Sequence, residues 1–258
     1  MARTLPLLVL LCSAPAVSLP PPAIRGLDYR LVFADEFEGP AGGSFDTNAW
    51  SSWAPGPRRD AVNQADAAAL DGNGNLAITT RREGDCYVTG GVSSAGRKGF
   101  IRGYFECRAR PQTQPGHWSA FWMMPHRMDK ALPPQTGGVE LDIFEYLRNG
   151  KLDRVANHTL HWGGYGSGHQ STNVHTVVAG IDSGWHTFAM LWTREGYRFF
   201  VDEQETGRLE GPVSEVRSHL IFSLEVGKWG GDIATAALPD SFLIDWVRVW
   251  QSPQDQAF

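Results

Sequence analysis

One six-residue stretch, Glu140 to Glu145 (ELDIFE), constrains the fold more than any other part of the chain. Its polar and apolar residues alternate, which is typical of a β-strand with one buried face. On a regular strand Glu140 and Asp142 point to one face and Glu145 to the other. One extra residue near Ile143 or Phe144, a β-bulge, would bring Glu145 back to the first face. The stretch therefore predicts either a solvated acidic strand or a bulged strand with three carboxylates on one face.

Three carboxylates on one face do not help folding, because like charges on neighbouring positions of a face repel. Glycoside hydrolysis does require such crowding, since it uses a pair of carboxyl groups whose pKa values are pushed apart. Retaining glycosidases hold the two groups roughly 5–5.5 Å apart. Same-face neighbours on a strand are separated by about 6.5–7 Å between Cα atoms. Because side chains can close that gap, one strand can carry both groups.

Four further segments accompany this stretch in the order GHWSAFWMMP (116–125), HTLHWGG (158–164), GWHTF (184–188) and FLIDWVRVW (242–250). In this order they resemble glycoside hydrolase family 16, the laminarinase and lichenase family. The resemblance runs from about residue 29 to residue 250. It implies a β-jelly roll of the concanavalin A type, a sandwich of two curved antiparallel sheets. The concave face would hold the carboxylate strand and bind a sugar chain.

The remaining sequence pattern also favours an all-β fold. Short runs rich in Val, Ile, Phe, Tyr, Trp and Thr recur between clusters of Gly, Pro, Asn and Asp, which predicts an antiparallel β-sandwich. The length of 258 residues suits one large all-β domain, and no repeat or second linker interrupts it. The net charge of -5 and the absence of a basic run exclude nucleic acid as an expected partner.

The first 18 residues are interpreted as a secretory signal peptide. Arg3 precedes a short apolar run from Leu5 to Val17, and small residues end at Ser18. The run is too short and too interrupted by proline to span a bilayer comfortably, although an uncleaved anchor is the alternative. We therefore expect a secreted or periplasmic protein with one catalytic domain over residues 19–258, monomeric and not bound to a membrane.

Two cysteines, Cys86 and Cys107, would then lie in an oxidising compartment. They flank a predicted hairpin whose turn lies between Gly96 and Arg97, and such a hairpin places position 86 opposite position 107. We predict one disulfide between them. The alternative is two separate buried thiols.

The resemblance also implies roles for the three carboxylates. Glu140 would be the nucleophile and Glu145 the general acid and base. Asp142 lies between them, where it can share a proton with Glu140 and keep Glu145 protonated through like-charge coupling. No cofactor is expected for catalysis.

Four residues are candidates for contact with the sugar chain. Trp118 and Trp122 are four apart on an apparent strand, so both can face the cleft, and core packing is the alternative for either. By resemblance, His161 lies on the leaving-group side and Asn63 hydrogen-bonds a sugar on the non-reducing side, although Asn63 also suits a turn. His158 and His161 would face opposite sides of a strand, which disfavours a zinc site.

A structural Ca²⁺ ion is a further implication of the resemblance. Its ligands would be Asp245, in the last strand, and main-chain oxygens of the segments that contain Glu36 and Gly74. Oxygen ligands are those that Ca²⁺ prefers.

The leading functional hypothesis is an endo-acting, retaining hydrolase of β-1,3- or mixed-linkage β-glucan. A galactanase of the agarase, porphyranase or carrageenase type is the first alternative, and Arg148, Lys151 and Arg154 are the local hint of anion recognition. A glucan-binding, lectin-like protein without turnover is the alternative from another class. It is disfavoured because both glutamates are present. A xyloglucan-type transglycosylase is disfavoured because the motif carries the extra residue.

Overall fold

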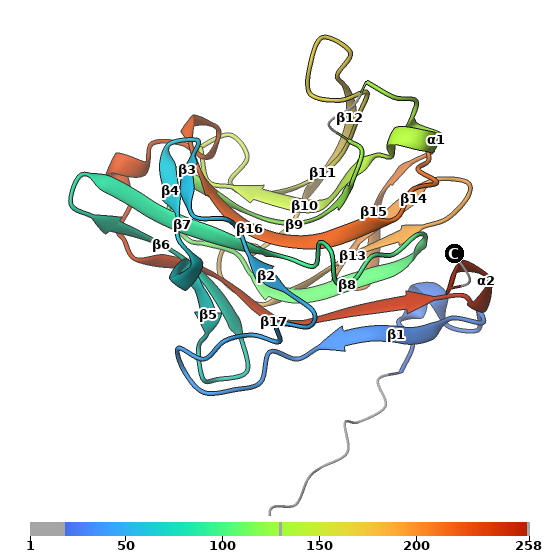
Figure 1. The fold of residues 1–258 in the computed structure, drawn as a ribbon, viewed down its shortest axis with the longest axis horizontal. Helices are drawn as coiled ribbons and strands as arrows, with labels where there is room; N and C mark the ends of the chain where they lie inside the picture. The colour runs from blue at the N-terminus through green and yellow to red at the C-terminus, as the bar shows by residue number, and fades with distance from the viewer. Residues whose placement is uncertain (1–18, 129–130, 257–258) are drawn as a thin grey trace, which may run out of the picture.

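Two curved β-sheets are stacked on each other in the computed structural model, which describes residues 19–128 and 131–256 (Figure 1). The cleft-side sheet has neighbouring strands in the order β2 (Ser51–Ser52), β7 (Cys86–Ser93), β16 (Ser218–Val226), β9 (His117–Pro125), β10 (Glu140–Leu147), β11 (Val155–Trp162) and β12 (Gln170–Val177). All these neighbours pair in the antiparallel sense.

The second sheet has β17 (Asp240–Gln251) near its edge. The strands that follow β17 across this sheet are β8 (Gly103–Arg110), β13 (His186–Trp192), β14 (Tyr197–Val201) and β15 (Gln204–Leu209). The other side of β17 pairs with β1 (Arg30–Asp35) and with β6 (Leu76–Glu83), which in turn pairs with β5 (Ala68–Leu70). The predicted class, a jelly-roll sandwich of two curved antiparallel sheets, is confirmed.

Short elements complete the fold. The strands β3 (Gly56–Arg58) and β4 (Ala61–Asn63) form a small hairpin, and β4 pairs with β7 in the parallel sense. The helical turns are η1 (Pro22–Ile24), η2 (Ala65–Ala67), α1 (Pro134–Gly137), η3 (Lys228–Gly230), η4 (Ile233–Thr235) and α2 (Pro253–Gln256). Among the described residues, no helix has the length and apolar character needed to cross a membrane. The predicted signal peptide lies outside the described residues.

Aromatic rings fill the space between the two sheets. Phe144 of β10 stacks on Phe188 of β13 with ring centroids 3.8 Å apart. Phe121 of β9 stacks on Phe222 of β16 with centroids 4.6 Å apart. All four side chains are fully buried. This core follows from the alternation of the strands, because one face of each strand meets the other sheet while the opposite face remains available for a cleft.

The predicted hairpin between Cys86 and Cys107 is wrong, because β7 and β8 belong to opposite sheets. A turn does form at Gly96, where the amides of Arg97 and Lys98 donate to the carbonyl of Ser94. The chain then crosses to the second sheet instead of returning along β7. Cys86 lies opposite Glu83 of β6, whereas Cys107 lies opposite Phe188 of β13. Both cysteines are therefore free thiols.

The two thiols should differ strongly in reactivity. Cys86 is exposed, whereas Cys107 is fully buried and its burial raises the pKa of the thiol. In a chain that begins at residue 19, a thiol reagent should modify Cys86 in the native state and Cys107 only after unfolding. Mass spectrometry of the labelled protein measures both steps. A chain with no reactive thiol after unfolding without reductant would contradict this assignment.

Candidate active site

A β-bulge in β10 brings the three carboxylates to one face. Asp142 lies opposite Thr159 and Glu145 lies opposite Asn157, so Ile143 and Phe144 together oppose a single residue of β11. Both bulge residues are buried in the core between the sheets. Glu145 consequently returns to the concave face together with Glu140 and Asp142, and all three line one cleft. The bulge predicted at Ile143 or Phe144 is confirmed.

Side chains of β11 hold this bulge in place. The Nδ1 atom of His158 lies 2.6 Å from the carbonyl oxygen of Ile143, and the side-chain amide of Asn157 donates to the carbonyl of Glu145 at 3.1 Å. Since a carbonyl can only accept, Nδ1 of His158 carries the proton. Burial lowers the pKa of His158 to about 4, so its ring is neutral at pH 7. This histidine, which the sequence analysis left without a role, satisfies a main-chain oxygen that the bulge releases from the ladder.

The cleft is lined by residues of β9, β10 and β16 and has a volume of about 460 Å³. Its walls combine acidic and aromatic side chains, which are Glu140, Asp142, Glu145, Glu225, Trp53, Trp118, Trp122 and Tyr165. Aromatic rings beside hydrogen-bonding groups suit a ligand with both apolar and polar faces. A sugar ring is such a ligand.

Burial and mutual repulsion raise the pKa values of the three carboxyl groups. Desolvation raises the pKa of Glu140 well above its usual range, and the charge of Asp142 raises it further. The same two causes, in the same order, raise the pKa of Glu145. The pKa of Asp142 is raised by burial and by the charge of Glu225. Because the groups interact, they take up protons as one cluster, which keeps at least one of them protonated near neutral pH.

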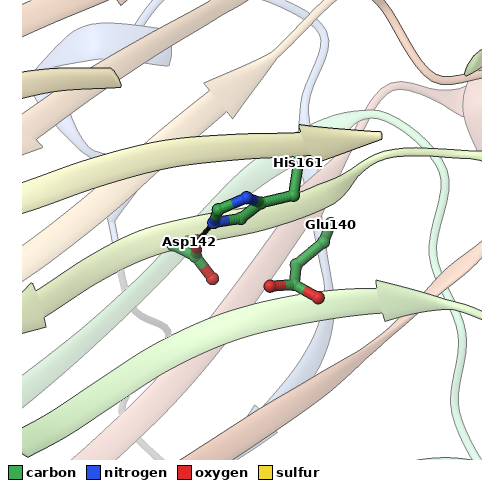
Figure 2. A group of neighbouring side chains, drawn as sticks. All are labelled: Glu140, Asp142 and His161. Atoms are coloured by element: carbon green, nitrogen blue, oxygen red, sulfur yellow. Dashed lines mark ion pairs between the residues drawn. The ribbon is translucent and has the colours of Figure 1, made fainter. Parts of the chain in front are cut away.

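His161 stands beside this cluster (Figure 2). Its Nε2 atom lies 3.3 Å from Oδ2 of Asp142, without the geometry of a hydrogen bond, and burial lowers the pKa of His161, which favours the neutral ring. Glu140, Asp142 and His161 each place one potential ligand atom within 4.8 Å of the others. However, Glu140 accepts a hydrogen bond from the hydroxyl of Tyr165, and Nδ1 of His161 lies 3.0 Å from Nε2 of His169. Because hydrogen bonds from the neighbouring loop already engage Glu140 and His161, we interpret the group as a hydrogen-bonded cluster, not as a metal site.

The two predicted tryptophans both face the cleft. Trp118 forms a side-chain hydrogen bond to Glu145, which opposes the rise in its pKa. Trp122 donates its indole N–H to the hydroxyl of Ser223 at 3.1 Å. Each packs edge-on against another tryptophan, Trp118 against Trp229 and Trp122 against Trp53. The spacing of four residues therefore placed both rings on the correct face.

Asn63 lies next to the cleft and not in it. It lines an adjacent hollow together with Trp53 and Arg58, which also line the cleft. Its Oδ1 atom is buried and accepts no hydrogen bond from the described part of the chain. The sugar-binding role of Asn63 remains a prediction.

A charged group that the sequence analysis missed lies across the cleft. Glu225 of β16 is almost fully buried and forms ion pairs with Arg58, at 2.7 Å, and with Arg59. An acidic residue within the apolar run from His219 to Val226 was a usable signal for Glu225. Neither arginine had such a signal, because both come from the β3–β4 hairpin, far away in the sequence.

The side chain predicted to bind Ca²⁺ already has a cationic partner. Asp245, the side-chain ligand of the set, forms an ion pair with Arg108. The carboxylate of Glu36 is held at 3.0 Å by Arg248. Next to Gly74, the nearest side chain is that of Glu38. The carboxylate of Asp245 would have to leave Arg108 to bind Ca²⁺, whereas the other predicted ligands are main-chain oxygens of the Glu36 and Gly74 segments, so the calcium site stays a prediction.

Comparisons with known proteins agree with this geometry. The family model of glycosyl hydrolases family 16 matches residues 57–248. A β-glucanase from Rhodothermus marinus is 29% identical over 252 residues, covering 86% of this chain and 85% of the relative. A keratan-sulfate endo-1,4-beta-galactosidase from Sphingobacterium multivorum is 28% identical over 243 residues, covering 88% of this chain but 56% of the relative.

A solved structure shows the same fold. The laminarinase from Flavobacterium sp. superimposes with a TM-score of 0.70 at 26% sequence identity, covering 86% of this chain and 100% of that one. The family model covers most of the chain, including the bulged strand and the cleft around it. The chain therefore belongs to glycosyl hydrolases family 16.

Proposed function

We propose that the chain is an endo-acting, retaining hydrolase of β-1,3- or mixed-linkage β-glucan. The observation that carries the proposal is the β10 bulge, which brings Glu140, Asp142 and Glu145 into one cleft. The similar β-glucanase and laminarinase support the choice of a glucan. Hydrolases of this family need no cofactor for catalysis. Secretion and a monomeric state belong to the same proposal.

The proposed reaction has two steps, each of which uses both glutamates. Glu140 attacks the anomeric carbon while Glu145 gives its proton to the departing glycosidic oxygen, which leaves a glycosyl-enzyme ester. Glu145, now ionised, then removes a proton from water, and this water displaces Glu140 from the sugar. Asp142 raises the pKa of Glu145, so that its proton is available at the first step. Configuration is inverted twice and therefore retained.

The charges around the cleft favour a neutral polysaccharide. Arg58 and Arg59 line the cleft and share one carboxylate partner, Glu225, whose single charge offsets one of the two cations. A sulfate group bound there would compete with the buried carboxylate of Glu225 for these cations, and loss of that pairing carries a desolvation cost. Tryptophan faces and hydrogen-bonding groups meet the needs of uncharged sugar rings without such a cost.

The three cations after the catalytic strand give no support for anion binding in the cleft. Arg148 lines a different hollow, together with Pro115 and Asn149. Its guanidinium donates to the carbonyl of Thr113 at 2.7 Å and lies 3.5 Å from Asp182. Lys151 and Arg154 do not line the cleft. The hint of anion recognition drawn from these residues is therefore wrong for the catalytic cleft.

A β-galactanase is the second candidate. The observation in its favour is the similar keratan-sulfate endo-1,4-beta-galactosidase, whose identity to this chain is close to that of the β-glucanase. The first glycosyl-enzyme step would be the same. The two candidates differ in the polymer that the cleft accepts.

A polymer panel tests the proposal. Purified protein should release reducing ends from laminarin or lichenan faster than from agarose, porphyran, carrageenan or keratan sulfate, because the cleft arginines are already paired. Initial rates at equal polymer mass measure the preference, and analysis of early products distinguishes internal from terminal cleavage. Faster cleavage of any of the four galactans would instead select the galactanase. Binding to laminarin without any release of reducing ends would indicate a lectin-like protein.

A further inference from the structure

The glycine-rich loop between β11 and β12, residues 163–169 (GGYGSGH), makes two contacts with the catalytic group. The hydroxyl of Tyr165 donates to Oε2 of Glu140. Nε2 of His169 lies 3.0 Å from Nδ1 of His161, whose other nitrogen faces Asp142. One loop therefore reaches both the proposed nucleophile and the histidine beside the central carboxyl.

The backbone of this loop is shaped to make these contacts. Gly163 has φ +79°, and a Cβ atom there would lie 2.4 Å from the carbonyl oxygen of Gly168. The amide of His169 donates to the carbonyl of Gly166 at 3.1 Å. Only glycine allows the two ends of the loop to approach so closely. The loop is thus folded back on itself, with Tyr165 at its tip and His169 at its base.

Three aromatic rings continue from the loop to the catalytic strand. The ring of Tyr165 lies nearly parallel to that of His169, with centroids 6.0 Å apart. The ring of His169 stacks in turn on that of His161, with centroids 5.1 Å apart. Packing along this row restricts how far Tyr165 can turn away from Glu140. Tyr165 is nevertheless 56% exposed, so the contact with Glu140 is not a consequence of burial in the core.

We propose that the 163–169 loop positions the nucleophile, with Tyr165 orienting the carboxylate of Glu140 and His169 orienting the ring of His161 against Asp142. This inference rests on the proposed function, since it takes Glu140 as the nucleophile. With one oxygen of Glu140 held by Tyr165, the other is directed to the sugar. Nε2 of His161 faces Asp142, and the direction of the hydrogen bond between the two histidine rings fixes whether a neutral His161 carries its proton on that nitrogen.

The hydroxyl of Tyr165 also affects ionisation. A donor to a carboxylate stabilises its charged form and thus lowers its pKa, in opposition to burial and to Asp142. The other titratable or charged groups that face Glu140 come from β10, β11, β16, the β3–β4 hairpin and the loop itself. They are Asp142, Glu145, His161, Glu225, Arg58, Arg59 and His169.

The variant Tyr165→Phe tests this role, with Tyr87→Phe, a tyrosine of β7 outside the cleft, as the matched control. We expect kcat on the best polymer to fall about 10-fold to 100-fold, the range for a hydrogen bond to a charged group, with little change in KM. The acidic limb of the kcat/KM profile should move to higher pH, because without its donor the ionised nucleophile is less stable. The melting temperature should match that of the control.

Other outcomes would overturn the inference. A kcat and an acidic limb equal to those of Tyr87→Phe would show that the hydroxyl does not act on Glu140. A raised KM with unchanged kcat would make Tyr165 a substrate contact instead.

His169→Gln should lower kcat more than His175→Gln, which alters β12 outside the loop. Equal kcat values would show that His169 has no part in positioning the nucleophile. If Glu140→Gln remains active, the proposed function itself is wrong. If Glu140→Gln is inactive but Tyr165→Phe has the same kcat and pH profile as the control, only this inference is wrong.

Discussion

Replacing either Glu140 or Glu145 by glutamine should lower kcat by several orders of magnitude and leave the fold intact. The amide has nearly the shape of the carboxyl but can neither attack the anomeric carbon nor donate the proton. The rate of reducing-end release and the melting temperature measure the two parts of this result. Glu83→Gln, a change at a half-exposed carboxylate of β6 outside the cleft, is the matched control. Substantial activity in both cleft variants, with native-like melting, would remove this site from consideration.

Azide should distinguish the two glutamates. In Glu145→Ala the glycosyl-enzyme still forms on a substrate with a good leaving group, and azide can replace water in the second step, giving a product of retained configuration. In Glu140→Ala no such ester forms, so azide must attack the sugar directly and invert it. NMR of the glycosyl azides measures the configuration. The opposite pairing of products would exchange the roles of the two residues.

Removing the ring of Phe144 should destabilise the protein by about 3–5 kcal/mol. The ring is fully buried, with its centroid 3.8 Å from that of Phe188 and 5.9 Å from that of Phe242. Phe144→Ala therefore removes buried apolar surface and leaves a cavity between the sheets. Denaturant unfolding measures the loss, and Val177→Ala, at a mostly exposed position of β12, should cost less than about 0.5 kcal/mol.

The same substitution also tests how the core controls the site. Phe144 is one of the two bulge residues, and its packing directs Glu145 back into the cleft. We expect Phe144→Ala to lower kcat even at temperatures where the protein remains folded, because the bulge no longer has a ring packed between the sheets to hold its backbone in place. A loss below about 1 kcal/mol with normal activity would show that Phe144 does not hold the bulge.

The bulged strand that carries three carboxylates on one face could be predicted from sequence because its signals are local. Alternation with a period of two shows which residues share a face, and the unfavourable crowding of three acids indicates a chemical role. The spacing of Trp118 and Trp122 placed both rings in the cleft for the same reason. The jelly-roll class followed from the recurrence of short strands and from the ordered family segments.

The predicted disulfide was wrong, and the partner of Asp245 was missed, because both depend on contacts between distant segments. The turn at Gly96 exists, yet the following residues pair with β16 and cross between sheets, so Cys107 belongs to a different sheet from Cys86. The carboxylate of Asp245 was available in the sequence, but Arg108 from β8 neutralises it. No local pattern distinguishes these outcomes from the predicted ones.

By itself, the sequence determined the all-β class and the strand of three acids, and it indicated a bulge as one of two outcomes, because side-chain alternation and charge repulsion act between near neighbours. Only the tertiary structure decided what surrounds the three carboxylates. Glu225 comes from β16, its two arginines from the β3–β4 hairpin and Tyr165 from the loop after β11. The burial and pairing of these residues set the pKa values and the orientation of the three carboxyl groups. They depend on which strands become neighbours, and the packing of the whole sandwich decides that.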